Sequence, residues 1–329
     1  MKTLTITGND AGRRLDRFLR KYLPGASLGT IYKIIRKDVK VNGVRRDTNY
    51  SLLEGDELTL YLSEEQIDSW SAKASHAAGV RRAKRQFGIL YEDDLVLAVD
   101  KPFGLLTHGD AKEKKNHLAN QVRDYLIETG AYDPRERVFS PAPANRLDRN
   151  TTGLVLFGKT SESLRTLTAM IREDAVDKFY TTIAYGEIKE DLELRGRIVK
   201  DERTNTVRVL PEEAEEGRPA VTRIHPLRTV GGYTLLEVQL ITGRTHQIRA
   251  HLASIGHPII GDVKYARGRA AIMNKRFKQR FELSTQLLHS TRVFFREAEG
   301  CLAYLEGESI ESPLPPSFTE ILTALENEK

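Results

Sequence analysis

The sequence predicts an α+β protein built from a small N-terminal module and a larger second domain. Residues 1–62 combine two amphipathic helical stretches with short strands. Residues 63–86 lose this periodicity and are rich in Ser, Ala, Glu and Lys, as linkers often are. Residues 87–329 contain strand and helix patterns, and their clearest strands alternate polar and apolar residues as antiparallel strands do. We therefore expect domains at 1–62 and 87–329, joined by a linker at 63–86.

The composition is that of a globular protein, because 40% of the 329 residues are hydrophobic, enough for one large core and a second small one. Cys301 is the only cysteine, which excludes an internal disulfide and a cysteine-based metal cluster. The first residues lack the apolar core of a signal peptide, and no apolar run approaches the roughly 20 residues that span a bilayer. We expect a cytoplasmic protein with no membrane association.

The charge is concentrated at the N-terminus. Residues 1–62 hold twelve lysines and arginines against seven aspartates and glutamates, which equals the +5 net charge of the whole chain. A basic module beside a nearly neutral domain favours a polyanion as the partner. An ordinary soluble surface is the alternative, because +5 is modest for this length.

Two helices are expected in the N-terminal module. In residues 12–25 the apolar side chains recur at helical spacing, namely Leu15, Phe18, Leu19 and Tyr22. Ser27 is suited to cap a second helix with Leu28, Ile31, Ile34 and Ile35 inward. Strands at 40–42 and 57–62 follow, with Asn42-Gly43 as a turn. The basic side chains outside the apolar faces are Arg13, Arg14, Arg17, Arg20, Lys21, Lys33, Arg36 and Lys37.

This module resembles the S4 domain, a small RNA-binding unit also found in a ribosomal protein. The resemblance is carried by Arg14-Leu15-Asp16-Arg17-Phe18-Leu19, Val41-Asn42-Gly43 and Gly55-Asp56. It implies that the basic faces of the two helices contact RNA phosphates through Arg14, Arg17, Lys33, Arg36 and Lys37. The alternative is that these side chains only keep the helices soluble.

The larger domain opens with strands at 89–91 and 95–102 and a helix at 117–129. A strand over 154–157 leads to a helix that Ser161 caps and that runs to about residue 173. The remaining elements expected are strands at 178–186, 220–224 and 234–240, a helix around Ile248 and Leu252, and a basic helical insert at 266–286. The insert is a second candidate for contact with RNA.

Residues 145–153 predict a tight turn that feeds a buried strand and holds one carboxylate, Asp148. Arg146 and Arg149 flank it, so we expect Asp148 to be ionised at neutral pH. An ionised carboxylate suits a nucleophile or a base and does not suit a resting general acid. The alternative is a turn or capping residue beside solvated arginines.

Five other residues are candidates for a role in a site. Arg249 lies beside the apolar stripe of its helix, and a partly buried guanidinium needs an anion. Tyr180 lies in a β-rich segment, where an aromatic residue usually belongs to the core. The histidines His246, His251 and His257 do not have zinc-protease spacing and no carboxylate completes a set, so we expect no metal.

The stretch from Arg146 to Thr160 resembles motif II of the RluA-type pseudouridine synthases, in which Arg-Leu-Asp carries the catalytic aspartate. The family more often has His where Asn145 stands. Residues 91–106 resemble motif I, which is largely structural, so Lys101 and Pro102 are given no chemistry. Residues 178–186 match the segment that supplies the active-site tyrosine, at Tyr180. Residues 242–252 resemble motif III, whose arginine pairs with the catalytic aspartate, and further matches lie at 261–265, 287–290 and 313–318.

The resemblance implies the pseudouridine synthase fold, a central mixed and mostly antiparallel sheet with flanking helices. It implies that uridines in RNA are converted to pseudouridine, with no cofactor. Arg146 would guide base flipping, Asp148 would cleave the glycosidic bond with Arg249 as its partner, and Tyr180 would stack on the uracil. Attack on C1′, attack on C6 and removal of a 2′ proton all remain open as the route.

The substrate implied is 23S ribosomal RNA or a large-subunit precursor, because the S4 module, Asn145 and the 266–286 insert look most like the RluC-type branch. We expect a monomer. Two alternatives have other chemistry. One is a non-catalytic RNA-binding or ribosome-assembly factor on the same fold, and the other is a glycosidase that releases free uracil.

Overall fold

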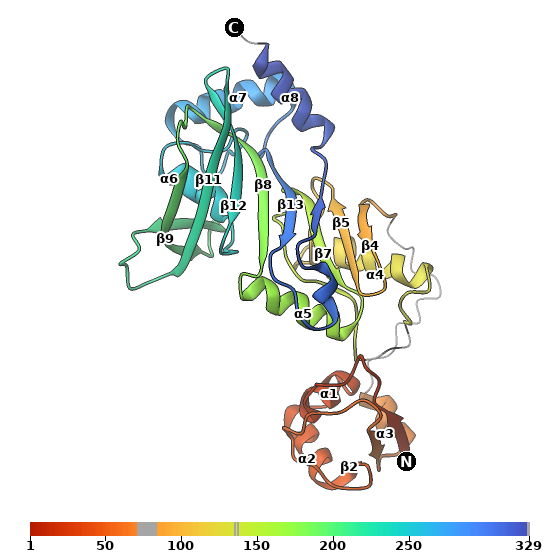
Figure 1. The fold of residues 1–329 in the computed structure, drawn as a ribbon. Coiled ribbons are helices and arrows are strands. Elements are labelled where there is room, and N and C mark those ends of the chain that lie inside the picture. Colours follow the sequence, from red (N-terminus) through yellow and green to blue (C-terminus); the bar gives the residue numbers. More distant parts are fainter. Residues whose placement is uncertain (71–83, 135, 137, 328–329) are drawn as a thin grey trace.

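The computed structural model describes residues 1–70, 84–134, 136 and 138–327, and these form two units (Figure 1). The N-terminal unit has its own apolar core and its own small sheet. The larger unit is organised around one twisted sheet. Among the described residues, no helix has both the length and the apolar character needed to cross a bilayer.

The N-terminal unit is a three-stranded antiparallel sheet covered by helices. The strand order is β1-β3-β2, with β1 at Lys2–Thr5, β2 at Val39–Val41 and β3 at Glu57–Leu60. Helix α1 spans Leu15–Tyr22, and the apolar side chains predicted to face inward are buried. Helix α2 spans Leu28–Asp38 and is capped as predicted, because Ser27 Oγ accepts a hydrogen bond from the Thr30 N–H. Leu28 was expected inward, but it lies in the first turn and is exposed.

The predicted linker begins later than residue 63. Residues Glu64–Trp70 form a third helix, α3, and Ile67 from this helix is buried in the N-terminal core. The N-terminal unit therefore extends to residue 70, because Ile67 and the partly buried Trp70 pack this short helix onto the core. The rest of the predicted linker from 71 to 83 lies outside the described residues.

The larger unit contains a mixed, mostly antiparallel sheet in the order β10-β9-β11-β12-β8-β13-β7-β5-β4, with β14 on β13 and β6 on β7. Only β13 and β7 are parallel neighbours among the described pairs. The strands are β4 Gly88–Glu92, β5 Val96–Lys101, β6 Ala142–Pro143, β7 Thr152–Gly158, β8 Val176–Tyr185, β9 Leu192–Asp201, β10 Thr206–Leu210, β11 Arg218–Val230, β12 Tyr233–Leu240, β13 Leu288–Phe295 and β14 Ser309–Glu311.

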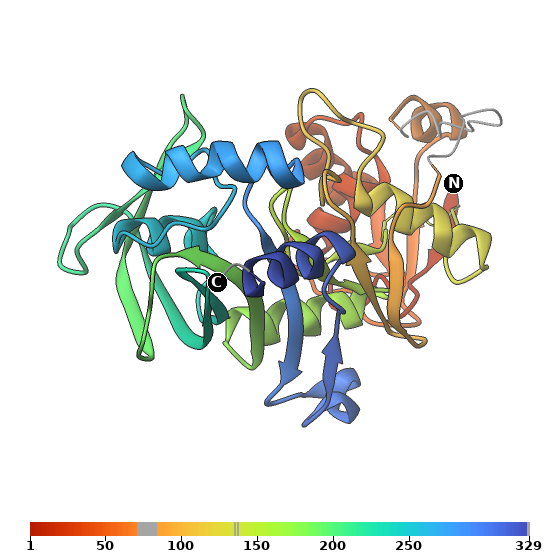
Figure 2. The same ribbon diagram turned by 90° about the horizontal axis from the view of Figure 1, so that it is seen from above.

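Helices cover both faces and one end of the sheet. They are α4 Leu118–Glu128, α5 Ser161–Arg172, α6 Gln247–Ser254, α7 Gly268–Phe281, α8 Pro316–Glu326 and a short 3₁₀ helix at Gly300–Leu305. Side chains of α4 and α6 share a core with one face, and side chains of α5 and the 3₁₀ helix share a core with the other. Seen from above, α7 and α8 lie in front of the sheet (Figure 2). Thr160 caps α5, one residue before the predicted Ser161.

Successive side chains of strand β7 point to opposite faces of the sheet and so belong to two different cores. Val155 and Phe157 pack on the α4 and α6 side, whereas Leu154 and Leu156 pack on the α5 side. Gly153 at its start has φ +102°, and a Cβ there would lie 2.2 Å from the Ser290 carbonyl oxygen of β13. Only glycine allows β7 and β13 to approach this closely, directly after the turn that carries Asp148.

The two units meet at the start of α5, which lies at the end of the sheet nearest the N-terminal unit (Figure 1). The Ser161 N–H donates to Asn9 Oδ1 at 3.0 Å, and Arg13 Nη2 donates to Ser161 Oγ at 3.2 Å. Lys21 Nζ donates to the Val138 carbonyl at 3.3 Å, and Val138 itself packs into the N-terminal core. Arg13 is therefore half-buried in this junction, whereas the helical pattern alone placed it on an outer face.

Candidate active site

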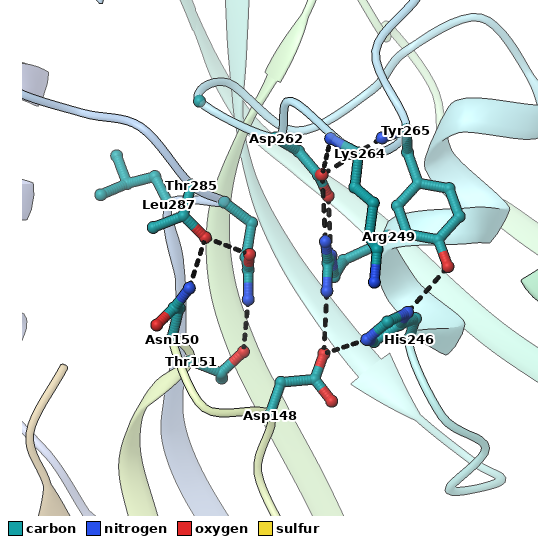
Figure 3. Close-up of polar contacts among 12 residues, drawn as sticks. Asp148, Asn150, Thr151, His246, Arg249, Asp262, Lys264, Tyr265, Thr285 and Leu287 are labelled. Carbon is teal, nitrogen blue, oxygen red and sulfur yellow. Dashed lines mark hydrogen bonds and ion pairs between the residues drawn. The ribbon is translucent and has the colours of Figure 1, made fainter. Parts of the chain in front are cut away.

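Asp148 lies in the turn that precedes β7, on the side of the sheet covered by α6 (Figure 3). The turn is closed by the Thr151 N–H, which donates to the Asp148 carbonyl at 3.1 Å. Lys101 fixes it from behind: its ammonium is fully buried and donates to the carbonyls of Arg149, Leu105 and Pro102 at 3.0, 2.8 and 3.0 Å. The backbone beside the carboxylate is thus tied to the end of β5.

Arg249 comes from α6 and contacts two carboxylates. Its Nε and Nη2 donate to Asp262 at 2.7 and 3.1 Å, and its Nη1 donates to Asp148 Oδ2 at 3.3 Å. Burial alone would lower the pKa of Arg249, but the hydrogen bonds and charge of Asp262, together with Asp148, raise it overall. The buried guanidinium therefore has the anionic partner that the sequence predicts. Its main partner is Asp262, which accepts two hydrogen bonds, and Asp148 accepts the third.

The two oxygens of Asp148 have different surroundings. Oδ2 contacts Arg249 Nη1 at 3.3 Å and lies 3.7 Å from His246 Nε2. In the part of the chain that the structure describes, no hydrogen bond or ion pair reaches Oδ1, and Figure 3 shows this oxygen pointing away from the contacts. One oxygen is held by the protein and the other is available.

Tyr180 lies on β8 and lines the same small pocket as Asp148 and Arg249. Its side chain is buried, and burial raises its pKa to about 12, so the phenol is neutral at physiological pH. Leu240, Ile248 and Leu288 form the apolar part of the lining. A neutral phenol and apolar side chains beside a carboxylate suit a planar aromatic group.

The pocket of about 60 Å³ opens onto a groove of about 790 Å³. Six side chains or backbones line both cavities, namely Arg146, Leu147, Asp148, Arg244, His246 and Arg249. The charged residues along the groove are mostly basic, with Arg146, Arg149, Lys200, Arg244, Arg249 and Lys264 against Asp148 and Asp262. A groove with this excess of positive charge favours an anionic polymer.

Four of the predicted site residues come together, because Arg146, Asp148, Tyr180 and Arg249 all line the small pocket. Arg146 is exposed at its mouth, whereas Arg149 turns away and donates to the Gly104 carbonyl at 3.0 Å. The five basic residues predicted on the N-terminal helices lie on the other unit and line neither cavity. Arg17, Lys33, Arg36 and Lys37 are exposed there, and Arg14 pairs with Asp16 at 3.0 Å.

The site also contains residues to which the sequence gave no role. Asp262 binds Arg249 through both carboxylate oxygens, and Lys101 holds the turn. His246 faces Asp148, and Tyr265 contacts His246. Asp262 and Tyr265 lie in a stretch whose resemblance to the family was noted without a function. Their partners are set by how the loop crosses α6, which no local pattern encodes.

The sequence of the chain is similar to that of a known protein family. Residues 95–254 match the family described as RNA pseudouridylate synthase. The chain is 31% identical over 325 residues to the ribosomal large subunit pseudouridine synthase C of Vibrio parahaemolyticus, covering 96% of this chain and 93% of that protein. It is 30% identical to the protein of the same name from Pasteurella multocida, covering 100% and 95%. For the Escherichia coli protein the identity is 32% over 270 residues, covering 80% of each chain.

Solved structures show the same fold. The human protein RNA pseudouridylate synthase domain containing 4 superimposes with a TM-score of 0.55 at 20% identity, covering 72% of this chain and 92% of that one. Human RNA pseudouridylate synthase domain containing 1 gives a TM-score of 0.50 at 20% identity, covering 74% and 95%. The predicted fold class is confirmed by these likenesses and by the sheet itself.

Proposed function

This chain belongs to the RNA pseudouridylate synthase family, and from that premise we propose that it isomerises specific uridines of large-subunit ribosomal RNA to pseudouridine. The enzyme class predicted from the sequence, an RNA pseudouridine synthase, is confirmed by the family match and by the relatives. Those relatives are named for the large ribosomal subunit, which supports the choice of RNA. Within it, we propose 23S ribosomal RNA or its precursor.

The arrangement of Asp148 is the observation on which the proposed chemistry depends. One carboxylate oxygen is held by Arg249, while the other has no partner among the described residues and adjoins a pocket that Tyr180 lines. A carboxylate with one oxygen held by a guanidinium and the other oxygen free suits attack on an electrophilic carbon or removal of a proton. We propose Asp148 as the catalytic residue and Arg249 as its partner.

The substrate must leave its own stack to reach this carboxylate, because the glycosidic bond of a stacked nucleotide is inaccessible. We propose that Arg146, exposed at the mouth of the pocket, guides the flip, and that Tyr180 contacts one face of the uracil. The base is cleaved from C1′, retained, turned and rejoined through C5. The reaction is redox-neutral, and attack on C1′, attack on C6 and removal of a 2′ proton all remain consistent with one free oxygen.

We propose that the N-terminal unit is an S4-like RNA-binding domain that adds affinity. All five of its predicted contact residues are exposed, with Arg17, Lys33, Arg36 and Lys37 on α1 and α2 and Arg14 at the N-cap of α1. The groove of the larger unit carries its own basic lining. Two separate basic regions would together neutralise more phosphates than either alone, which predicts a steep dependence of binding on salt.

Purified protein and large-subunit ribosomal RNA labelled with tritium at C5 of uridine provide the direct test. Formation of the new C–C bond at C5 releases tritium to water, so an active isomerase yields tritium release with no change in RNA mass. Free uracil and abasic RNA would instead show a glycosidase, and tight binding without either product would show a binding factor. Either of these results would overturn the proposal.

The substrate is tested by mapping pseudouridines in ribosomal RNA from a strain that lacks the gene. We expect one or a few large-subunit uridines to lose the modification and to regain it when the gene is restored. An unchanged large-subunit map would contradict the proposed substrate.

A further inference from the structure

His246 occupies an unusual place at the start of α6. It is the N-cap residue of this helix and adopts the left-handed conformation with φ 52°. A residue other than glycine in this region is uncommon, and such residues gather at functional sites. Its side chain is only 8% exposed, and the ring lies between Tyr265 and the catalytic carboxylate (Figure 3).

The two ring nitrogens of His246 face different groups. Nδ1 lies 2.8 Å from the hydroxyl oxygen of Tyr265, and Nε2 lies 3.7 Å from Asp148 Oδ2. The Tyr265 hydroxyl oxygen also accepts a hydrogen bond from the Val207 N–H of β10 at 2.9 Å. A backbone N–H has no alternative role, so this bond fixes the direction of the chain of contacts.

Proton counting assigns the tautomer. If Nδ1 carried the proton and donated to Tyr265, the phenol proton would have no acceptor among the described residues. If the phenol donates to Nδ1, every hydrogen in the chain is used, and the imidazole proton is then on Nε2. The Nε2–H faces Asp148, whereas the other tautomer would turn a lone pair toward a carboxylate.

The ring is neutral in these surroundings. Burial lowers the pKa of His246, and the charge of Asp148 only partly offsets this effect. Arg249 of α6 and Lys264 of the following loop lower it further, and Asp262 of that loop raises it. Around neutral pH, the tautomer therefore decides whether His246 attracts or repels the carboxylate.

We propose that His246 is a positioning residue for catalysis, held as the Nε2–H tautomer by a relay from the Val207 N–H through the Tyr265 hydroxyl. With Arg249 it occupies the Oδ2 side of Asp148, so that Oδ1 is the reacting oxygen. At 3.7 Å the contact is a dipolar attraction and not a hydrogen bond. This inference rests on the proposed function for its catalytic meaning, but the tautomer can be tested without it.

Two substitutions at residue 246 separate positioning from folding. Gln places its amide N–H₂ where Nε2 was, whereas Asn places it nearer Nδ1. Asn accepts the left-handed conformation more readily than Gln does, so a purely structural role predicts that His246→Asn is the better variant. The relay predicts the reverse, with kcat of His246→Gln within about threefold of wild type and kcat of His246→Asn lower by about tenfold or more.

Tyr265→Phe tests the relay without touching His246. The ring stays, and with it the contact to the Arg249 guanidinium at 5.0 Å and to the imidazole at 5.7 Å. Only the hydroxyl is lost, so we expect kcat to fall severalfold with RNA affinity nearly unchanged, and thermal stability to fall modestly because the Val207 N–H loses its acceptor. Tyr185→Phe is the matched control, because this tyrosine packs on Tyr233 and lines neither cavity.

Long-range proton–nitrogen NMR of histidine-labelled protein reads the tautomer directly, with the His246 signals identified by their loss in His246→Gln. We expect the Nε2–H pattern at pH 7 to 8 and a mixture in Tyr265→Phe. An Nδ1–H pattern in the wild type, an Asn variant as active as the Gln variant, or a Tyr265→Phe kcat equal to the control would each overturn the inference. A wild type that releases no tritium would instead defeat the proposed function, while the NMR result would still decide the relay.

Discussion

The turn that carries Asp148 and the junction between the two units differ in how their buried charged groups are bonded. At the turn, Arg249 contacts two aspartates and Lys101 donates to three carbonyls. At the junction, Asp10 Oδ1, Arg13 Nε and Glu136 Oε1 are buried without a hydrogen-bond partner in the described structure. The two other such atoms, on His251 and Asn274, belong to groups that are neutral around pH 7, so the charged groups with such an atom all lie at the junction.

The difference indicates different requirements. A carboxylate that attacks one carbon or takes one proton needs a fixed position, which the contact of Arg249 and the hydrogen bonds of Lys101 provide here. A buried polar atom without a hydrogen-bond partner is costly, so contacts that leave such atoms are more easily rearranged or hydrated. Burial raises the pKa of both Asp10 and Glu136, which is the expected response of carboxyls that lack sufficient partners. Hydrogen bonding is therefore less complete at the junction than at the turn that carries Asp148.

Asp148→Asn provides the largest test of the rigid site. The amide is nearly isosteric but cannot act as a nucleophile or base, so we expect turnover to fall by about 10³-fold or more with RNA affinity largely unchanged. Single-turnover tritium release and filter binding measure the two quantities. Near-normal turnover would remove Asp148 from the mechanism.

Arg249→Ala is expected to affect both folding and turnover, because it leaves Asp262 buried without its cation. Removal of one partner of a buried pair typically costs about 3–5 kcal/mol. Urea unfolding measures this loss. The double variant Arg249→Ala with Asp262→Ala is the control, since removing both charges should recover part of the stability but none of the turnover. If the single variant unfolds like the wild type, the pairing is not structural.

Lys101→Met tests the support behind the turn. Methionine fills a similar volume but leaves the carbonyls of Leu105, Arg149 and Pro102 without their donor. We expect a loss of about 2–3 kcal/mol in the free energy of unfolding and a lower kcat at unchanged RNA affinity. Wild-type stability in this variant would show that the turn does not depend on the ammonium.

His251 provides a test of whether its buried imidazole is neutral in the folded protein. Burial lowers its pKa to about 4, so between pH 6.5 and 4 the unfolded chain binds a proton that the folded protein does not. The free energy of unfolding therefore falls as the pH is lowered through this range, by about 2 kcal/mol at pH 5. Urea unfolding of His251→Asn should show a pH dependence smaller by this amount between pH 7 and 5. An unchanged pH dependence would contradict burial of a neutral imidazole.

Arg13→Met should have the smallest effect on the free energy of unfolding. It is matched to Lys101→Met because both variants replace a long cationic side chain with methionine. Arg13 gains one hydrogen bond to Ser161 but leaves Nε unpaired, so we expect the free energy of unfolding to change by less than about 1 kcal/mol. kcat should be unaffected. A loss as large as that of Lys101→Met would erase the contrast between the two regions.

Features encoded by neighbouring residues were predictable from the sequence. The apolar face of α1, the Ser27 cap and the strand β8 follow from local spacing, and Asn42 and Gly43 both have the positive φ that their turn type requires. Helix α3 escaped because seven residues with a single buried anchor give no periodic signal. The capping residue of α5 was misplaced by one position because Thr160 and Ser161 are both suitable caps.

The candidate site was predictable only in part. Family resemblance singled out Asp148, Tyr180 and Arg249, and they line one pocket. It did not reveal that Asp262 is the nearer partner of Arg249, or that Tyr265 and Val207 together act on His246. These contacts join a helix, a loop and a hairpin that are distant in the sequence. They depend on how these elements pack in the fold, which no local sequence pattern encodes.

Strand β7 links the two regions compared above. The turn with Asp148 precedes it, and Ser161, which receives Arg13 from the N-terminal unit, follows it by three residues. Seven residues at about 3.3 Å each give the strand a length of roughly 23 Å. If the N-terminal unit binds RNA as we propose, β7 sets how far the RNA segment bound there lies from the uridine to be modified. Target selection would then depend on RNA architecture as much as on the bases around that uridine.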